Sequence, residues 1–336
     1  MRDEKINLLS RLNRRQWIAL AGSAVLVCST SAVFFSRRVV PRQPLTIASS
    51  VWPGYELMFL ARSEGWMADP GIALLATASA TASLAALAAG EANGAALTLD
   101  EMLRARAANL PLSAVLVFDV SAGADVVLAR SGIETLADLD GKRIGVEQSA
   151  LGALMLHKVL ETTGLAKAAL TLVPVTIDGH PLAWRTGQVD ALITYEPIAS
   201  ALQAEGGHRI FDSRQIPDTI FDVLAVRTEA IREHASPLRN LVSGHFRALH
   251  HLHTNPQDAA YRLSRCLGLP ADAVLAAYHG VELPNLYQNR QYLSGSDRRL
   301  VTAARSLSAI LVEEGLIPQP DDLQGLVNAS LLPDEY

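Results

Sequence analysis

The sequence predicts an α/β fold in which two mainly parallel sheets are flanked by helices. This prediction rests on the order of the elements. Short β-prone runs alternate with helical segments from residue 45 to about 226, and the pattern is nearly all helical from 228 onward. Such alternation is typical of parallel sheets, whose ligands bind at the carboxyl ends of the strands. With 336 residues, of which 49% are hydrophobic, the chain can bury one large core or two moderate ones.

The first unit of this pattern joins a strand, a turn and a helix. Leu45 to Ser50 form a short β-prone run, which Trp52-Pro53-Gly54 ends abruptly. An apolar stripe at helical spacing follows, and Gly65 is placed to end that helix.

The later elements repeat this alternation and are separated by polar turns. Ser79-Ala80-Thr81 precedes a helix rich in Ala and Leu, and the turn at Asp140-Gly141 leads into a strand that Ser149 follows as a helix cap. The expected strands are 45–50, 72–76, 94–98, 113–119, 125–129, 143–147, 171–175, 190–194 and 220–226. The expected helices are 55–66, 80–89, 100–108, 150–163, 180–187 and 197–204.

The change to a helical pattern near residue 228 indicates two lobes, the second inserted into the first. A second α/β lobe, followed by a helical tail that returns to the first, gives this order of elements. We assign 1–43 to a leader, 44–129 to the first part of lobe one, 130–224 to lobe two and 225–336 to the completion of lobe one with its tail. The chain is expected to cross between the lobes near Ala129-Arg130 and Val226-Arg227.

The N-terminal segment predicts export. Arg14 and Arg15 precede Trp17 to Phe35, nineteen consecutive residues without a charge, and Arg37-Arg38 follow. A basic region before an apolar run is typical of an export signal, and the paired arginines fit a twin-arginine route as well as the general one. Nineteen apolar residues also approach the roughly 20 that span a bilayer. The segment is therefore either a signal cleaved after Ala32 or an uncleaved anchor to the inner membrane, and both place the rest of the protein in the periplasm.

Several phrases of the sequence are similar to those of a known family. Residues 52–55 read WPGY, residues 137–146 read ADLDGKRIGV, and residues 187–197 read GQVDALITYEP. Together with 90–100, they resemble periplasmic solute-binding proteins of the nitrate, sulfonate and taurine group over most of the region 45–226. The resemblance implies the type II periplasmic-binding-protein fold, with a hinged cleft between the lobes. It also implies a small-molecule solute, delivery to the membrane subunits of an ABC importer, a monomer, and no cofactor.

Polar side chains at strand ends and helix N-termini are the candidate ligand groups. At these positions, backbone amides face the cleft and can hold the polar end of a solute. Several candidates have a purely structural alternative, which is a helix cap for Thr81, Asp100 and Ser149. For Trp52 the alternative is core packing, and for Glu196 it is a strand-to-helix junction. The candidates are Trp52, Tyr55, Thr81, Thr98, Asp100, Ser121, Asp125, Ser149, Tyr195 and Glu196.

The charge of these groups favours a neutral or cationic solute. Carboxylates stand at Asp100, Asp125, Glu147 and Glu196, with no lysine or arginine at the same junctions. Several carboxylates raise the Coulomb cost of an oxyanion in a closed cleft of low dielectric. We therefore expect a nitrogen-containing solute, such as an amine or a heterocycle stacked on Trp52. A sulfonate-like solute is the alternative that the family suggests.

The sequence contains no motif for metal binding or catalysis. It has no His-Glu-x-x-His order, no Cys pair of zinc spacing, no Gly-x-Ser-x-Gly elbow, no phosphate loop and no dinucleotide fingerprint. The net charge of −5 has no basic cluster, so nucleic acid is not an expected partner. Two other functions stay open. One is a membrane-tethered sensor lobe for a signalling partner, and the other is an enzyme like the pyrimidine synthases of thiamin biosynthesis, whose cysteine-rich motif is missing here.

Overall fold

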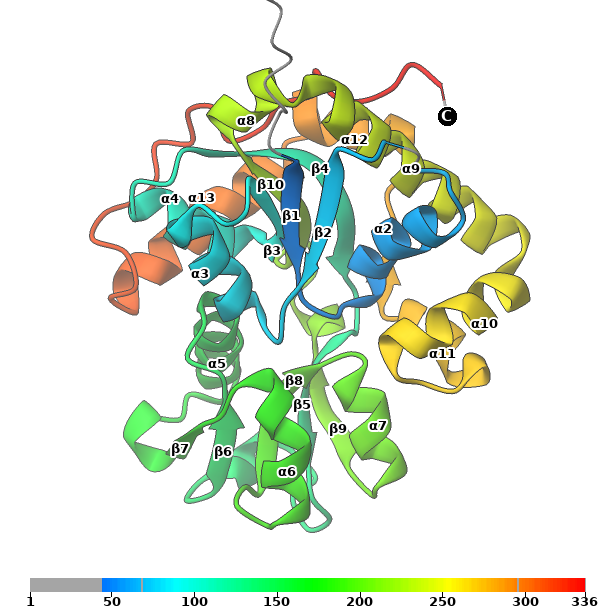
Figure 1. The fold of residues 1–336 in the computed structure, drawn as a ribbon. Helices are drawn as coiled ribbons and strands as arrows, with labels where there is room; N and C mark the ends of the chain where they lie inside the picture. Colours follow the sequence, from blue (N-terminus) through cyan, green and yellow to red (C-terminus); the bar gives the residue numbers. More distant parts are fainter. Residues whose placement is uncertain (1–43, 68, 295, 336) are drawn as a thin grey trace, which may run out of the picture. The chain divides into compact units, whose positions relative to one another are not determined.

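The computed structural model describes residues 44–67, 69–294 and 296–335. From Pro44 onward the chain forms one compact unit, in which two lobes are each built around a β-sheet (Figure 1). The expectations about the leader, namely the uncharged run 17–35, the paired arginines and cleavage after Ala32, lie outside the described residues. Among the described helices, none is long and apolar enough to cross a membrane.

Lobe one contains, within the described residues, a six-stranded sheet of order β11-β4-β10-β3-β1-β2. β1 pairs in parallel with β2 and β3, whereas β10 pairs antiparallel with β3 and β4, and β11 pairs antiparallel with β4. The strands are β1 (Leu45–Ser49), β2 (Ile72–Ala76), β3 (Gly94–Thr98), β4 (Leu112–Ser121), β10 (Phe221–Arg227) and β11 (Val281–Glu282).

Helices cover both faces of this sheet. α3, α4 and α13 lie on one face, and α2, α9 and α10 lie on the other (Figure 1). The helices of lobe one are α2 (Pro53–Ser63), α3 (Ala80–Ala89), α4 (Leu99–Ala107), α8 (Thr228–Glu233), α9 (Ala235–Thr254), α10 (Pro256–Leu267), α11 (Ala271–Tyr278), α12 (Leu286–Ser294) and α13 (Arg299–Glu313).

Lobe two contains, in the same described part of the chain, a five-stranded sheet of order β7-β6-β8-β5-β9. β6 pairs in parallel with β7 and β8, and β5 pairs antiparallel with β8 and β9. The strands are β5 (Asp125–Ala129), β6 (Arg143–Val146), β7 (Thr171–Pro174), β8 (Ala191–Tyr195) and β9 (His208–Asp212), and the helices are α5 (Ala150–Thr163), α6 (His180–Arg185) and α7 (Ile198–Ala204).

The helix boundaries follow from local sequence. Ser79 and Ser149 cap α3 and α5, because each hydroxyl accepts a hydrogen bond from a backbone amide in the first turn, as that of Ser149 does from Gly152 at 3.1 Å. Gly90 and Gly164 end the same two helices at φ 75° and 70°, in the left-handed region that glycine adopts without steric cost. These caps direct the N-termini of α3 and α5 to the junction of the lobes.

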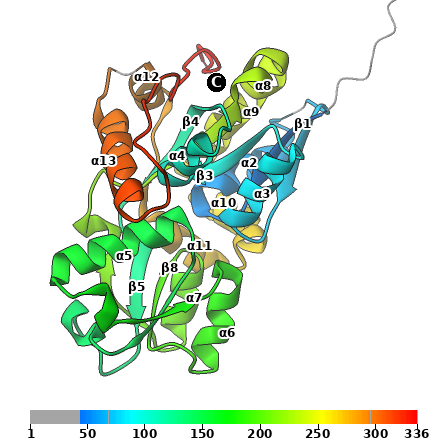
Figure 2. The ribbon, with the colours of Figure 1, turned by 90° about the vertical axis from the view of Figure 1, so that its left-hand side faces the viewer.

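Helix α5 joins the cores of the two lobes. It belongs to lobe two but packs against α4 and α13 of lobe one, below α13 in Figure 2. Leu103 of α4, Leu154 of α5 and Leu307 of α13 are all buried in one continuous apolar cluster. The lobes are therefore linked by apolar packing as well as by the chain crossings.

The predicted α/β class is confirmed, and three details differ from the sequence prediction. The sheets are mixed and not mainly parallel, because the strands next to the crossings run antiparallel to their neighbours. β5, placed in lobe one by the sequence, pairs within lobe two, so the segments between the sheets are 122–124 and 213–220. β9 and β11 were not expected: β9 reads HRIFD, with little apolar alternation, and β11 has two residues. Hydrophobic pattern identifies a strand but not its partner.

A buried carboxyl group on α2 gives a prediction about stability. Glu56 is 4% exposed, and burial raises its pKa to about 7, although a hydrogen bond with Cys266 acts in the opposite direction. Because the folded pKa lies above the unfolded value, the proton on Glu56 stabilises the fold at low pH. That stabilisation is lost as the pH rises from about 4.5 through 7. Glu56→Gln, which carries no charge, should unfold like the wild type at pH 4 and be about 3 kcal/mol more stable at pH 8.

Denaturant unfolding at the two pH values measures this difference. Glu91→Gln is the matched control, because Glu91 is exposed and the same substitution there should change stability at neither pH. A gain for Glu56→Gln that is equal at pH 4 and pH 8 would contradict the assignment of the effect to a buried charge.

Candidate functional site

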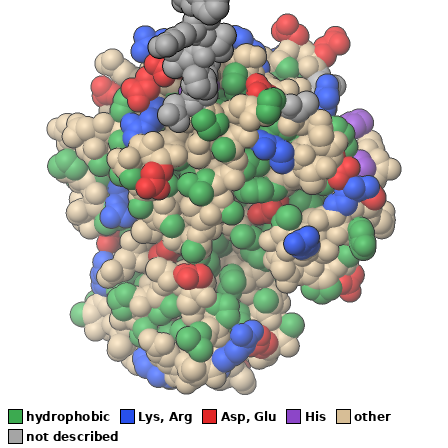
Figure 3. All heavy atoms as spheres, in the orientation of Figure 1, with side chains coloured by type: hydrophobic (Ala, Val, Ile, Leu, Met, Phe, Trp, Pro, Cys, Tyr) green, Lys and Arg blue, Asp and Glu red, His purple; other side chains and the backbone are tan. Residues whose placement is uncertain are grey.

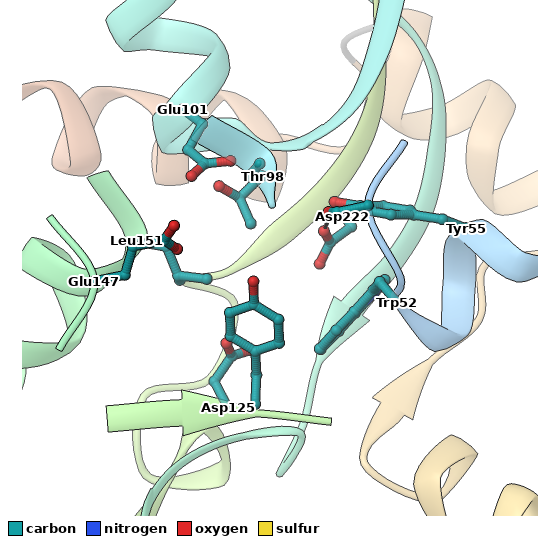
Figure 4. Close-up of a pocket in the computed structure, with 11 residues that line it drawn as sticks. Trp52, Tyr55, Thr98, Glu101, Asp125, Glu147, Leu151 and Asp222 are labelled. Carbon is teal, nitrogen blue, oxygen red and sulfur yellow. Dashed lines mark hydrogen bonds between the residues drawn. The ribbon is translucent and has the colours of Figure 1, made fainter. Parts of the chain in front are cut away.

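A small cavity lies between the lobes, where the carboxyl ends of the parallel strands meet (Figure 4). Its volume is about 20 Å³, close to the space that one water needs, so a larger solute requires the lobes or the lining side chains to move apart. Lobe one contributes Ser50, Trp52, Tyr55, Ala80, Thr98, Glu101 and Asp222, and lobe two contributes Asp125, Glu147, Leu151 and Tyr195.

The topology brings these side chains together. Trp52 follows β1, Thr98 ends β3, Glu147 follows β6 and Tyr195 ends β8. Parallel strands of one sheet end at the same edge, so both lobes present their strand ends to the shared cavity.

Aromatic side chains form one wall of the cavity. The rings of Trp52 and Tyr195, from different lobes, lie 5.7 Å apart in an edge-to-face arrangement. Trp52 also contacts Tyr55, with a centroid distance of 6.4 Å. A flat solute group that inserts between the lobes would therefore contact an aromatic ring from each lobe.

Carboxyl groups make up the ionisable acidic part of the cavity, beside the hydroxyl groups of Ser50, Thr98 and the two tyrosines. Glu101, Asp125, Glu147 and Asp222 line it, and among the described residues no lysine or arginine does so. Burial raises the pKa of Asp125 to about 7, and a hydrogen bond from Ser121 acts in the opposite direction. Burial also raises the pKa of Glu101 and of Asp222 well above their usual range, and the charge of neighbouring carboxylates adds to both shifts. These groups hold protons or require a cation when the lobes are closed.

The structure brings five of the ten predicted site residues to the cavity and places two more at its margin. Thr81 donates from its hydroxyl to Glu147 across the lobe boundary at 3.3 Å. Ser149 caps α5 and lines a smaller adjoining cavity with Asp125 and Glu147. The five residues that line the main cavity are Trp52, Tyr55, Thr98, Asp125 and Tyr195.

The other three predicted residues do not line the cavity. Asp100 is fully buried, and Ser121 forms a hydroxyl–hydroxyl hydrogen bond of 2.7 Å with Ser213 in the segments between the lobes. Glu196 is also buried, but its carboxylate accepts hydrogen bonds from the backbone and hydroxyl of Ser200, each at 3.0 Å, and pairs with Arg209. Glu196 thus has its partners within lobe two.

Sequence reasoning did not select Glu101 and Asp222. Asp222 lies near the start of β10, and because β10 is antiparallel to β3, this start is at the cavity edge of the sheet. The candidate positions were strand ends and helix N-termini, and Asp222 stands at the start of a strand. Glu101 follows Asp100 in the first turn of α4, so both carboxyl groups were visible in the sequence. Which of the two lines the cavity was not.

Comparisons with solved structures identify this fold in other proteins. The periplasmic aliphatic sulphonate-binding protein SsuA from Escherichia coli is 19% identical, with a TM-score of 0.68, over 86% of this chain and 99% of that chain. The alkanesulfonate-binding protein SsuA from Xanthomonas axonopodis pv. citri, bound to MOPS, is 20% identical, with a TM-score of 0.71, over 85% and 98% of the two chains. The desulfurization enzyme DSZB is 18% identical, with a TM-score of 0.63, over 86% and 97%. These likenesses confirm the periplasmic-binding-protein fold that the sequence resemblance implies.

Comparison at the level of sequence gives the family. No curated protein sequence shows a significant match. The family profile described as NMT1/THI5 like matches residues 52–259, which is more than half of the chain and includes every residue that lines the cavity except Ser50. The chain therefore belongs to the NMT1/THI5-like family.

Proposed function

We propose that this protein is the extracytoplasmic solute-binding component of an ABC importer. Its solute is a small, nitrogen-containing organic molecule that is cationic or neutral with N–H donors. The family, the two-lobed fold and the names of the SsuA proteins support the general role. The observation that carries the solute class is that, among the residues the structure describes, four carboxyl groups line the cavity and no lysine or arginine does.

The charge of the cavity separates this solute class from the sulfonates of the structural neighbours. At about 4 Å and an effective dielectric constant of about 20, each unlike charge pair contributes roughly 4 kcal/mol and each like pair costs as much. A sulfonate would meet such a cost from each of these groups that is ionised in the closed cavity, whereas a cation would offset it.

Solute binding would stabilise the closed arrangement of the lobes. Both lobes contribute contacts, from Trp52 and Asp222 on one side and from Asp125 and Tyr195 on the other. A solute that touches both sets favours the closed state by its differential affinity for that state. The closed form would then dock on the membrane subunits of the importer.

The surface charge does not favour nucleic acid as a partner. On the face in Figure 3, Lys and Arg side chains are interspersed with Asp and Glu, unlike the single-sign patches of nucleic-acid-binding surfaces.

The likeness to DSZB raises the question of an enzyme on the same fold. A thiol nucleophile would have to lie at the cavity, beside a base. Cys266 is the cysteine of the described residues, and it lies exposed on α10, outside the cavity lining. Binding without chemistry is therefore the function that this cavity supports best.

The solute class is tested by a thermal-shift screen of the full chain against amines, nitrogen heterocycles, sulfonates and inorganic oxyanions. An amine or heterocycle should raise the melting temperature, and Trp52→Ala should weaken its binding by roughly 3- to 10-fold through lost stacking. Trp66→Ala is the control, because Trp66 lies outside the cavity, against His251. A sulfonate as the sole stabilising class would contradict the proposed solute.

Copurification distinguishes a transport component from a sensor. Copurification with a signalling partner instead of transporter subunits would favour a sensor.

Export is tested by cell fractionation. The uncharged run 17–35 predicts that the full-length protein is found with the cell envelope or, after cleavage, in the periplasm. Finding it in the cytoplasm with its leader intact would contradict both export and uptake.

A further inference from the structure

Two aspartates face each other on neighbouring strands of lobe one, at the edge of the sheet that borders the cavity. Asp119 of β4 and Asp222 of β10 are direct partners in the antiparallel register, and both side chains are buried. Like charges placed directly opposite each other on neighbouring strands destabilise a sheet. This pair therefore needs a proton or a cation to compensate one of its charges.

The WPGY segment supplies one neutral donor to each aspartate. The indole Nε1 of Trp52 donates to Oδ2 of Asp119 at 2.9 Å, and the hydroxyl of Tyr55 donates to Oδ1 of Asp222. Gly54 makes the close approach possible, because a Cβ there would lie 1.9 Å from Oδ2 of Asp119. The turn that is the most distinctive feature of the sequence thus fixes the orientation of both carboxyl groups.

Each aspartate keeps one oxygen without a partner outside the pair. Oδ1 of Asp119 and Oδ2 of Asp222 are buried, and within the described residues neither accepts from a donor outside the pair, whereas the two carboxyl groups lie within hydrogen-bonding reach of each other. Asp222 lines the cavity, where Figure 4 shows its carboxyl group beside Tyr55 and Trp52. Buried carboxyl oxygens normally accept hydrogen bonds. These two oxygens therefore indicate a proton shared between the carboxyl groups and a hydrogen-bond donor on the solute.

Within the described part of the chain, no basic side chain compensates the charge of the pair. Burial raises the pKa of Asp119 to about 7 and that of Asp222 well above its usual range, with the charge of Asp119 adding to the second shift. Among the described residues, the titratable groups that interact with the pair or line the cavity with it are neutral or acidic. Tyr55 on α2, Asp125 on β5, Tyr195 on β8 and Tyr278 on α11 interact with the pair, and Glu101 on α4 and Glu147 after β6 line the cavity with Asp222.

We propose that Asp222 is the residue that selects a cationic N–H donor in the solute, and that Asp119 is its positioning residue, which shares one proton with it. This assignment rests on the proposed function of solute binding. The singly protonated pair carries one negative charge, which a monocation neutralises. Oδ2 of Asp222 then accepts the N–H of the solute, while Asp119 stays fixed by Trp52.

The shared proton is tested first on the protein without solute. Melting temperatures of the full chain and of its Asp119→Asn variant are measured from pH 5 to pH 8. The asparagine keeps an acceptor for Trp52 and offers Asp222 a permanent N–H, so it imitates the protonated pair. The variant should gain several degrees over the wild type between pH 5 and pH 8, since only the wild type loses a stabilising proton as the pH rises. A difference in melting temperature that is the same at every pH overturns the shared proton.

Selection by Asp222 is tested with three probes that have the same ring and different charge: benzamidine, benzamide and benzenesulfonate. Titration of the full chain should show the tightest binding for benzamidine, with an affinity that rises from pH 5 to pH 7. Asp222→Asn should weaken benzamidine at least tenfold, and Asp119→Asn should flatten the pH profile. Glu91→Gln, an exposed control, should change neither.

The outcomes separate this proposal from the proposed function. Equal binding of benzamidine to the wild type and to Asp222→Asn overturns the role of Asp222 and leaves solute binding intact. Preference for benzenesulfonate overturns the cationic solute class as well. If none of the three probes binds, selection of a cation by Asp222 is overturned.

Discussion

Replacing Arg209 with methionine is expected to destabilise the protein by about 3 kcal/mol, the lower end of the range for removing one partner of a buried ion pair, because the Arg209 side chain is itself 25% exposed. Arg209 on β9 pairs with Glu196, whose side chain is 2% exposed. The guanidinium also donates to the carbonyl of Gly123 at 2.6 Å and to the side chain of Gln203 at 2.9 Å. Methionine fills a similar volume but leaves the buried carboxylate without its cation. Denaturant unfolding of the full chain measures the loss.

Arg185→Met is the matched control for this prediction. Arg185 forms an ion pair with Glu205 in the same lobe, but its side chain is 59% exposed. Exposed pairs contribute about 1 kcal/mol or less, so this variant should stay close to the wild type. Equal effects of the two substitutions would show that Glu196 does not depend on Arg209.

The case of Glu196 illustrates why site prediction from the sequence was incomplete. A carboxylate at the end of a strand, before a proline, fits a ligand group as well as a junction, and the choice depends on what lies beside it. Arg209 lies beside it only because β9 pairs with β5 and not with a more distant strand. β9 shows little alternation, so neither the strand nor the arginine that it carries could be placed from the sequence.

Elements with strong local signals were predicted well. α3 and α5 were expected at their observed bounds, because serine caps and glycine ends mark both helices. The strand ends that carry Trp52, Thr98 and Tyr195 were also expected, and the structure brings all three to the cavity. These predictions needed only local pattern and the rule that parallel strands end at one edge.

The aspartate pair at the cavity could not be predicted from local sequence pattern. Asp119 and Asp222 are more than a hundred residues apart in sequence, and they meet through the antiparallel register of β4 and β10. The sequence pattern around either residue does not show the direction of its strand in the sheet. It therefore does not show whether the first or the last residues of that strand lie at the cavity. Their role became visible only from the register and from the donors on the WPGY turn.

Gly54→Ala is expected to destabilise the protein by about 3 to 5 kcal/mol. The added Cβ would lie 1.9 Å from Oδ2 and 2.9 Å from Cγ of Asp119. The buried carboxyl group would have to move away from Trp52, which combines overpacking, about 1 to 3 kcal/mol, with the cost of leaving a buried donor unsatisfied, also about 1 to 3 kcal/mol. Denaturant unfolding of the full chain measures the effect, and indole fluorescence reports whether Trp52 is displaced.

A double-mutant cycle isolates the cause of this loss. In an Asp119→Ala background the obstructing oxygen is absent, so Gly54→Ala should cost less than about 1 kcal/mol. It could even stabilise the protein there, because alanine is a better helix former than glycine by up to about 1 kcal/mol. The effect of the substitution on the unfolded chain is the same in both backgrounds and cancels in the cycle. If the cost persists without the Asp119 side chain, Gly54 is required by the backbone conformation of α2. The close approach of the carboxyl group of Asp119 would then not explain this glycine.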